Sequence, residues 1–320
     1  MIRKDQKIEV IKPPTRIKYK KFCKNIYRKY RKQYISHNDN NQPIIDTSFL
    51  TNLLVEKLKP LINDSYVRNK KYDEIDFING IIDVLNNGTY WNRYKDKISG
   101  KYLNKRHNRY CEWGVYECLY RIISLSYYST NKYNKLKYQC IDSTFIKNLY
   151  GSEIYGRNVE YKSKNGIKVS VIVDINGVLN SFAIGCGNSN DGKIALQQIN
   201  NNMLIDTDTS SVKNNNRFKQ IMIADAAYYS KELYSQLKKK GYTPITDVNK
   251  RNTKKKELLK IIENDKKKYQ KIQGKLLKVK NFNAWIKKYP KIDRLVEKSV
   301  KSFIGLLLLG CSMILINKLD

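Results

Sequence analysis

The strongest constraint on the fold is a change of sequence pattern near Lys137. From that point, three short runs of β-branched and aromatic residues follow one another, separated by turn signals. The runs cover residues 138–146, 166–175 and 178–186. Asn176-Gly177, between the last two runs, is typical of the tight turn of a β-hairpin. Three neighbouring strands are therefore expected, and the last two should form a hairpin.

The chain beyond these strands alternates between helical and strand patterns. A helical stretch opens at Asp191-Gly192, and the apolar strand 220–225 follows a polar loop. A helix that ends at Gly241 comes next and leads into the strand 242–247. Strands in series, followed by alternating helices and strands, predict a mixed α/β sheet with flanking helices.

These patterns divide the chain into three parts. The parts are a basic arm at 1–45, a mostly helical module at 46–130, and a sheet domain at 137–320 with a lysine-rich helical insert at 252–271. In the module, helical periodicity covers residues 48–62, 72–86 and 112–128. Residues 99–110 are expected to form a basic turn stretch. A helical module of this kind can place a helix in a groove of DNA.

The balance of charge points toward nucleic acid. Lysine and arginine number 62 against 29 acidic residues, which gives a net charge of +33. Such an excess favours a polyanionic partner. A/T-rich codons offer another explanation, because they also encode the abundant Asn, Ile and Tyr. The basic arm fits either a DNA-binding element or a surface helix whose Phe22, Ile26 and Tyr30 face a core.

Several other classes of protein are disfavoured. The six cysteines form no Cys-x-x-Cys pair, and only two histidines accompany them, so a zinc site is not expected. The first 20 residues are basic and lack the apolar block of a signal peptide, which favours an intracellular protein with reduced thiols. The apolar run 303–316 is shorter than the roughly 20 residues of a membrane-spanning helix. It predicts a buried terminal helix.

Two aspartates stand where a sheet of this kind places its ligands. Asp142 lies within the first strand, and Asp225 ends the strand 220–225. Ligands of α/β sheets bind at the carboxyl ends of the strands. If the two strands are neighbours, both carboxylates can bind hard cations such as Mg²⁺ and support phosphodiester cleavage. Either aspartate alone more often caps the next turn or helix.

The order of motifs around these aspartates resembles that of bacterial insertion-sequence DDE transposases, which have a ribonuclease-H-like fold. The motifs are IDSTFI at 141–146, the basic segment 156–178, ADAAYYS at 224–230, TPITDVNKRNTK at 243–254 and NFNAWIKKYPKI at 281–292. The resemblance covers residues 139–316 and, more faintly, GTYWNRY at 88–94. It implies an enzyme that uses two Mg²⁺ or Mn²⁺ ions to cut and join double-stranded DNA, as a homo-oligomer and without a membrane.

The resemblance also implies roles for individual residues. Asp142 and Asp225 match the two aspartates that bind metal in the family. Asp191 matches a recurrent aspartate that holds a loop near the site. Residues implied to lie near DNA are Lys162, Lys164 and Lys168 in the basic loop, and Asn249 and Arg251 in an Asn-x-Arg segment. Solvated surface turns are the alternative interpretation of these five residues.

The sequence departs from the family at the third catalytic acid. The family has a helical Glu in the pattern Val-Glu-x-x-Phe-x-x-Leu/Ile-Lys, whereas Lys280 follows Val279 here. A protonated ammonium cannot ligate a metal, and the site's formal charge becomes −1 instead of −3. Metal affinity should therefore fall. Glu297 and Glu263 are two acids that could replace the missing one, although Glu297 better matches an acid found before the family's last helix.

Three functions remain open at this point. The first is a transposase that binds element-end DNA and has weak or lost strand-transfer activity. The second is a catalytically inactive, transposase-derived DNA-binding protein, which would bind DNA in a salt-sensitive way without binding divalent cations. The third is a ribonuclease-H-like nuclease acting on RNA or repair intermediates, which would cleave without recognising inverted repeats.

Overall fold

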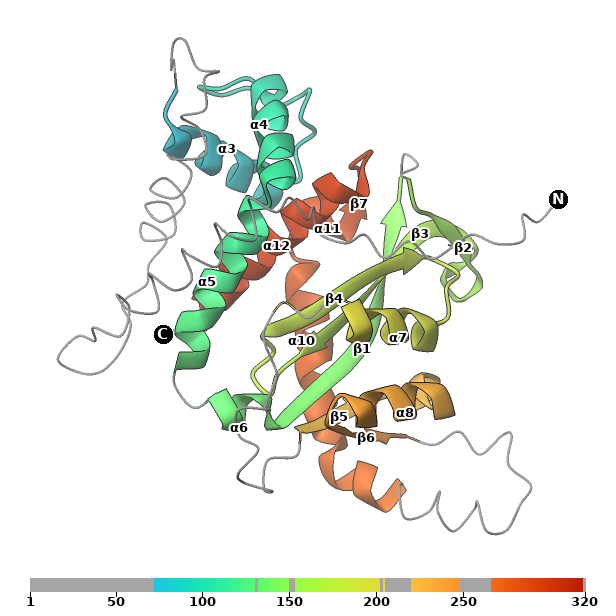
Figure 1. Cartoon of the computed structure of the whole chain (residues 1–320). Coiled ribbons are helices and arrows are strands. Elements are labelled where there is room, and N and C mark those ends of the chain that lie inside the picture. The colour runs from blue at the N-terminus through green and yellow to red at the C-terminus, as the bar shows by residue number, and fades with distance from the viewer. Residues whose placement is uncertain are drawn as a thin grey trace. The chain divides into compact units, whose positions relative to one another are not determined.

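The computed structural model describes residues 72–129, 132–149, 153–201, 204, 220–247 and 266–318 (Figure 1). These residues belong to two compact units. The sheet unit contains the described residues of 132–148, 154–247 and 266–284, and the helical unit contains 72–129, 149, 153 and 285–318. The basic arm, the predicted helix 48–62, Asn249, Arg251 and Glu263 lie outside the described residues.

The sheet unit is built on the five long strands that the sequence predicts. They are β1 (Tyr138–Asn148), β3 (Lys164–Val173), β4 (Leu179–Cys186), β5 (Gln220–Ala224) and β6 (Tyr242–Thr246). The strands β1, β3 and β4 pair antiparallel, whereas β5 pairs parallel with both β1 and β6. A short β2 (Gly156–Asn158) also pairs with β3. The prediction of a mixed α/β sheet of the ribonuclease-H-like type is confirmed.

Helices cover both faces of this sheet. The helices α7 (Asp191–Asn201) and α8 (Lys231–Lys239) lie on one face (Figure 1). There they bury a cluster that includes Ile141, Ile172, Met222, Ala195, Ile199, Leu233 and Leu237. The helix α10 (Leu277–Ile286), of which residues to Ala284 belong to this unit, lies on the other face. Shorter helical elements are α6 (Lys132–Lys137), η1 (Val159–Tyr161), η3 (Ala226–Tyr228), residues 266–272 and η5 (Gln273–Leu276).

The helical unit surrounds the apolar run near the carboxyl terminus. Its elements are α3 (Glu74–Asn87), α4 (Gly100–Trp113), α5 (Val115–Ser129), α11 (Pro290–Asp293), β7 (Arg294–Leu295) and α12 (Val300–Ile316). The side chains of Phe303, Leu306 and Leu307 on α12 are fully buried. Helix α12 is thus the buried terminal helix that the apolar run predicts. In the part of the chain that the structure describes, no helix has the length and apolar character needed to cross a membrane.

One predicted element of this unit is wrong. Residues 99–110 were expected to form a turn stretch, but most of them belong to helix α4. Leu103, His107, Tyr110 and Cys111 recur at helical spacing, and all four are buried. Helix α5 consequently begins at Val115 rather than near residue 112, because Gly114 ends α4 with a φ of 68°.

The grouping of the last residues differs from the sequence-based division. The sequence pattern predicts one domain over residues 137–320, whereas the described residues from Trp285 onward pack with the helices of residues 72–129. Helix α12 contacts α5 and α4 along its buried face. An apolar helix needs apolar partners on every side, and helices α4 and α5 supply them. The separate folding of the predicted domains remains a prediction.

A buried polar cluster lies inside the helical unit around His107. The His107 ring contacts the Tyr116 hydroxyl through Nδ1 at 2.8 Å and Ser302 Oγ through Nε2 at 2.9 Å, and it stacks on Trp91. Burial lowers the pKa of His107 to about 4, against a smaller opposing effect of Glu297. In the native protein, the His107 ring therefore stays neutral at pH values well below the ordinary pKa of histidine.

This burial predicts a loss of stability in mild acid. Unfolded His107 takes up a proton near pH 6.5, whereas the folded form does so only near pH 4. The contribution is therefore fully present above pH 6.5 and is lost as the pH falls toward 4, by up to about 3 kcal/mol. Urea unfolding should show a steeper decline between these pH values in the wild type than in His107→Gln. Glu297, Lys291, Tyr116 and Cys111 surround position 107 in both proteins, so their own titration is common to the two curves. Equal slopes would contradict the prediction.

Candidate active site

The two aspartates singled out by the sequence lie at the same level of neighbouring parallel strands. Strand β1 pairs with β5 through Cys140 and Ile223, and Asp142 and Asp225 each stand two residues further on. Adjacent strands are about 4.8 Å apart, and residues two positions apart face the same side of a sheet. Both carboxylates therefore project from the α10 face, opposite the buried Ile141 and Met222.

Asp225 is exposed where strand β5 ends and η3 begins. Its backbone remains extended, with φ −78° and ψ 173°, and its Oδ1 accepts a hydrogen bond of 2.6 Å from the Ala227 amide. This is the capping contact that an aspartate makes at the start of a helical turn. The contact fixes the orientation of the carboxylate through Oδ1.

Asp142 is less exposed than Asp225, because it lies within strand β1, which pairs with β3 on one side and β5 on the other. Burial raises the pKa of Asp142 to about 6, and the Asp225 and Asp191 carboxylates act in the same direction. The Ser143 amide and the Lys280 ammonium oppose this shift. A carboxylate that is costly to keep charged, beside a second carboxylate, is an arrangement that a bound cation would relieve.

Lys280 lies on α10, and its charge reaches Asp142. The side chain is exposed, yet its ammonium lowers the pKa of Asp142. Lys280, at the position where the family resemblance implies a third acid, is therefore within electrostatic reach of Asp142. A positive charge at this position offsets part of the negative charge of Asp142 and competes with any cation that Asp142 attracts.

Asn283, which the sequence pattern does not indicate as a site residue, contacts Asp142 directly. The Asn283 side chain is 8% exposed, and its Nδ2 donates a hydrogen bond of 3.3 Å to Asp142 Oδ2. Its Oδ1 is buried without a hydrogen-bond partner. An unpaired buried acceptor costs about 1–3 kcal/mol. The available signal was spacing, because Asn283 follows Lys280 by three residues and shares its face of the helix.

Asp191 begins helix α7 and is held by two contacts. Ser143 Oγ donates a hydrogen bond of 2.7 Å to Asp191 Oδ1, and Lys168 Nζ lies 3.1 Å from the same atom. These contacts join the start of α7 to β1 and β3. The negative charge of Asp191 raises the pKa of Asp142, and its role in holding a loop near the site stays a prediction.

The three lysines of the predicted basic loop have different surroundings. Lys168 lies on β3 opposite Phe145, and its side chain is 13% exposed in the ion pair with Asp191. Lys162 is exposed in the turn before β3, where Lys162 and Ser163 have φ values of 56° and 54°, and Lys164 is exposed as the first residue of β3. Lys162 and Lys164 are therefore accessible to a ligand, whereas Lys168 is bound within the sheet unit.

Glu297 does not have the surroundings of a replacement acid. It is buried in the helical unit, where Lys291 Nζ lies 3.1 Å from Oε1 and Ser302 Oγ donates a 2.6 Å hydrogen bond to Oε2. The Trp91 indole donates a further bond of 3.0 Å to Oε1. The oxygens of Glu297 are already used in holding α11, α12 and the segment around Trp91 together.

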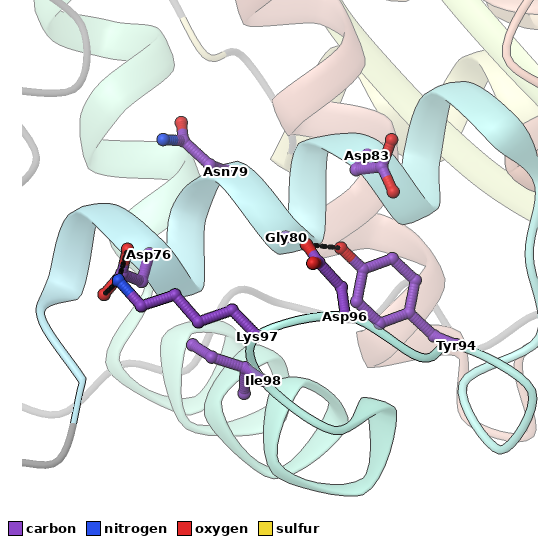
Figure 2. Close-up of a pocket in the computed structure, with 8 residues that line it drawn as sticks. All are labelled: Asp76, Asn79, Gly80, Asp83, Tyr94, Asp96, Lys97 and Ile98. Carbon is purple, nitrogen blue, oxygen red and sulfur yellow. Dashed lines mark hydrogen bonds and ion pairs between the residues drawn. The ribbon is translucent and has the colours of Figure 1, made fainter.

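The helical unit also contains a pocket with acidic walls (Figure 2). Its volume is about 220 Å³, and it is lined by Asp76, Asn79, Gly80, Asp83, Tyr94, Asp96, Lys97 and Ile98. Lys97 Nζ pairs with Asp76 at 2.9 Å, and the Tyr94 hydroxyl donates to Asp96 at 3.2 Å. Burial raises the pKa of Tyr94 to about 12. Asp76 and Asp96 are thus each paired with another residue of the pocket wall. The pocket contains no residue that the sequence indicated as functional.

The donor set near Asp142 and Asp225 suits a hard divalent cation. Carboxylate and amide oxygens are the ligands that Mg²⁺ and Mn²⁺ prefer. Within the described ranges, no three His, Cys, Asp or Glu side chains come together as a metal-binding group. The buried, unpaired Asn283 Oδ1 is an additional oxygen donor beside Asp142. The residues present therefore fit a cation held by two carboxylates and neutral oxygens.

Comparison with known proteins agrees with this arrangement. Residues 134–304 match the family model described as transposase DDE domain. The match covers more than half of the chain and includes Asp142, Asp225 and Lys280. No curated protein and no solved structure matches the chain.

Proposed function

The chain belongs to the family of transposases with a DDE domain, and from this premise we propose that it binds the end DNA of a mobile element and has impaired strand-transfer activity. The observation that carries the proposal is the pairing of Asp142 with Asp225 next to a lysine. The strand register supports a two-carboxylate site. The effect of Lys280 on Asp142 supports a weakened one.

Asp142 and Asp225 would hold one or two Mg²⁺ or Mn²⁺ ions. The bound metal would activate water or a 3′-hydroxyl and stabilise the leaving oxygen of the phosphodiester. The Ala227 amide orients Asp225, and the Ser143 amide and Asn283 fix Asp142. Asp191 accepts a hydrogen bond from Ser143 on the strand that carries Asp142, and Lys168 forms an ion pair with Asp191.

The proposed DNA contacts come from the basic surface. Lys162 and Lys164 are exposed where the turn after Tyr161 leads into β3, and Tyr161 stacks on Phe145. Asn249 and Arg251 are proposed to contact phosphate as well. A chain of charge +33 should bind DNA with a strong dependence on salt, because each neutralised phosphate releases counterions. Two element ends require two active sites, so we propose a homo-oligomer on DNA inside the cell.

The test combines DNA binding with cleavage on the full chain. Wild-type protein should bind its element's terminal DNA, and the affinity should fall by about 10³-fold or more between 50 and 200 mM salt. Cleavage of the same DNA with Mg²⁺ or Mn²⁺ should be at or near background. The Asp142→Ala variant should bind DNA like the wild type and show no cleavage. Rapid wild-type cleavage that Asp142→Ala abolishes would refute the impaired state but support the transposase chemistry.

A second candidate is a catalytically inactive DNA-binding protein derived from a transposase. The lysine at position 280 favours it, because it lowers the negative charge available to a cation. Titration calorimetry separates the two candidates. Salt-sensitive DNA binding without any uptake of Mg²⁺ or Mn²⁺ would support the inactive protein, whereas metal uptake lost in Asp142→Ala would support the impaired enzyme.

A further inference from the structure

We propose that the amide oxygen of Asn283 is the third protein ligand of the cation held by Asp142 and Asp225. This inference rests on the proposed function, since it completes the same metal site. A hard divalent cation usually binds several oxygens. Within the described part of the chain, no third acid, histidine or cysteine joins the two aspartates. A third ligand from this region must therefore be a neutral oxygen.

The Asn283 side chain is placed for this role by its burial and by its contact with Asp142. Its Nδ2 lies 3.3 Å from Asp142 Oδ2, and the residue is 8% exposed. Its Oδ1 is bonded to the same carbon as Nδ2 and has no hydrogen-bond partner. Rotation of the amide about the Cβ–Cγ bond exchanges the two atoms and turns Oδ1 toward the carboxylate. A cation beside Asp142 would thus find an acceptor that the metal-free protein leaves unpaired.

The helix geometry explains how this residue can compensate for position 280. Asn283 follows Lys280 by three residues, so both side chains leave α10 on the same face. The Lys280 ammonium cannot bind a metal, but its long side chain can extend into solvent. An amide oxygen ligates hard cations without adding charge. The site would therefore keep its third oxygen and bind the cation less tightly than three carboxylates would.

Direct measurement of Mn²⁺ binding to the full chain tests the role of Asn283. We expect titration calorimetry of the wild type to detect Mn²⁺ uptake, and Asp142→Ala to abolish it. Asn283→Ala should weaken the affinity by about tenfold or more, as the loss of a metal ligand or its partner does. Asn283→Asp should tighten binding by about tenfold, because it adds a carboxylate. The matched control is Asn281→Ala, an exposed asparagine on the same helix, which should bind Mn²⁺ like the wild type.

A thermal unfolding series separates ligation from a merely structural role. In the absence of metal, the Tm values of Asn283→Asp and Asn281→Ala show whether these substitutions by themselves affect folding. The increase of Tm on addition of Mn²⁺ should be smaller in Asn283→Ala than in the wild type, and larger in Asn283→Asp. A structural role would change the metal-free Tm without changing the increase.

The outcomes also distinguish this inference from the proposed function. If the wild type and Asn283→Ala take up Mn²⁺ with equal affinity, and Asp142→Ala does not, the role of Asn283 is overturned while the metal site stands. If the wild type binds no Mn²⁺ but Lys280→Glu does, Asn283 is not a sufficient ligand. The lysine at position 280 then accounts for the lack of Mn²⁺ binding. If neither protein binds Mn²⁺, both proposals fail.

Discussion

Replacing Lys280 by Glu should raise metal-dependent cleavage of the element's end DNA by at least about 100-fold. Partners that only orient a metal ligand already change metal affinity or activity by about 10–100-fold. The substitution does more, because it removes a cation that acts on Asp142 and adds an oxygen ligand on α10. The formal charge of the three positions would change from −1 to −3. The measurement is the initial rate of cleavage at fixed Mg²⁺ or Mn²⁺ concentration.

Two further variants identify the cause of this gain. Lys280→Gln removes the positive charge without adding a carboxylate, so it should recover only part of the activity. Lys278→Glu makes the same change of charge at an exposed position two residues away on the same helix, and it should have little effect. A gain as large in Lys278→Glu as in Lys280→Glu would show that net charge alone is responsible. No gain in Lys280→Glu would show that position 280 is not the only lesion.

Replacing Lys291 by Met should destabilise the helical unit by about 3–5 kcal/mol. Lys291 is 1% exposed, and its ammonium lies 3.1 Å from the buried carboxylate of Glu297. The pKa of Glu297 is lowered despite its burial, because Lys291 and Ser302 stabilise the charged form. Removal of one partner leaves an uncompensated buried charge, which is strongly destabilising. Urea unfolding monitored by circular dichroism at pH 7 measures the change in the free energy of unfolding.

The control for this prediction is a surface lysine of the same unit. Lys288→Met, at an exposed position, should change the free energy of unfolding by no more than about 0.5 kcal/mol. The double variant Lys291→Met with Glu297→Gln should recover part of the loss, because a neutral amide can still accept bonds from Trp91 and Ser302. If Lys291→Met is as stable as Lys288→Met, the ion pair does not stabilise the fold.

The strands and most helices could be predicted from the sequence because their signals are local. The apolar run that becomes β5, the turn at Asn176-Gly177 and the glycine after α3 each act over a few residues. Helix α4 was missed because its buried face includes His107 and Tyr110, which do not count as strongly apolar in a sequence pattern. Their polar atoms are satisfied only by partners elsewhere in the fold, so no local pattern reveals their burial.

In the candidate site too, some residues could be predicted from the sequence and others could not. Asp142 and Asp225 could be singled out because each lies at a recognisable position of a strand. The ion pair of Lys168 with Asp191 and the contact of Asn283 with Asp142 could not, since 23 and 141 positions separate the partners. Lys168 was grouped with the loop lysines for this reason. Its side chain extends from β3 toward the start of α7, and only the folded sheet brings these elements together.

The sequence by itself determined the five long strands and most of the helices, the two acidic positions on the strands, and the lysine at position 280, where the family resemblance implies an acid. Hydrophobic periodicity, turn residues and charge are local properties, and the order of residues states them directly. The tertiary structure alone decided that the carboxylates share one level of the sheet and that the Asn283 oxygen is buried unpaired beside them. It also decided that the last helix packs with the amino-terminal helices. These facts depend on which distant surfaces exclude water from one another, and sequence separation carries no information about that choice.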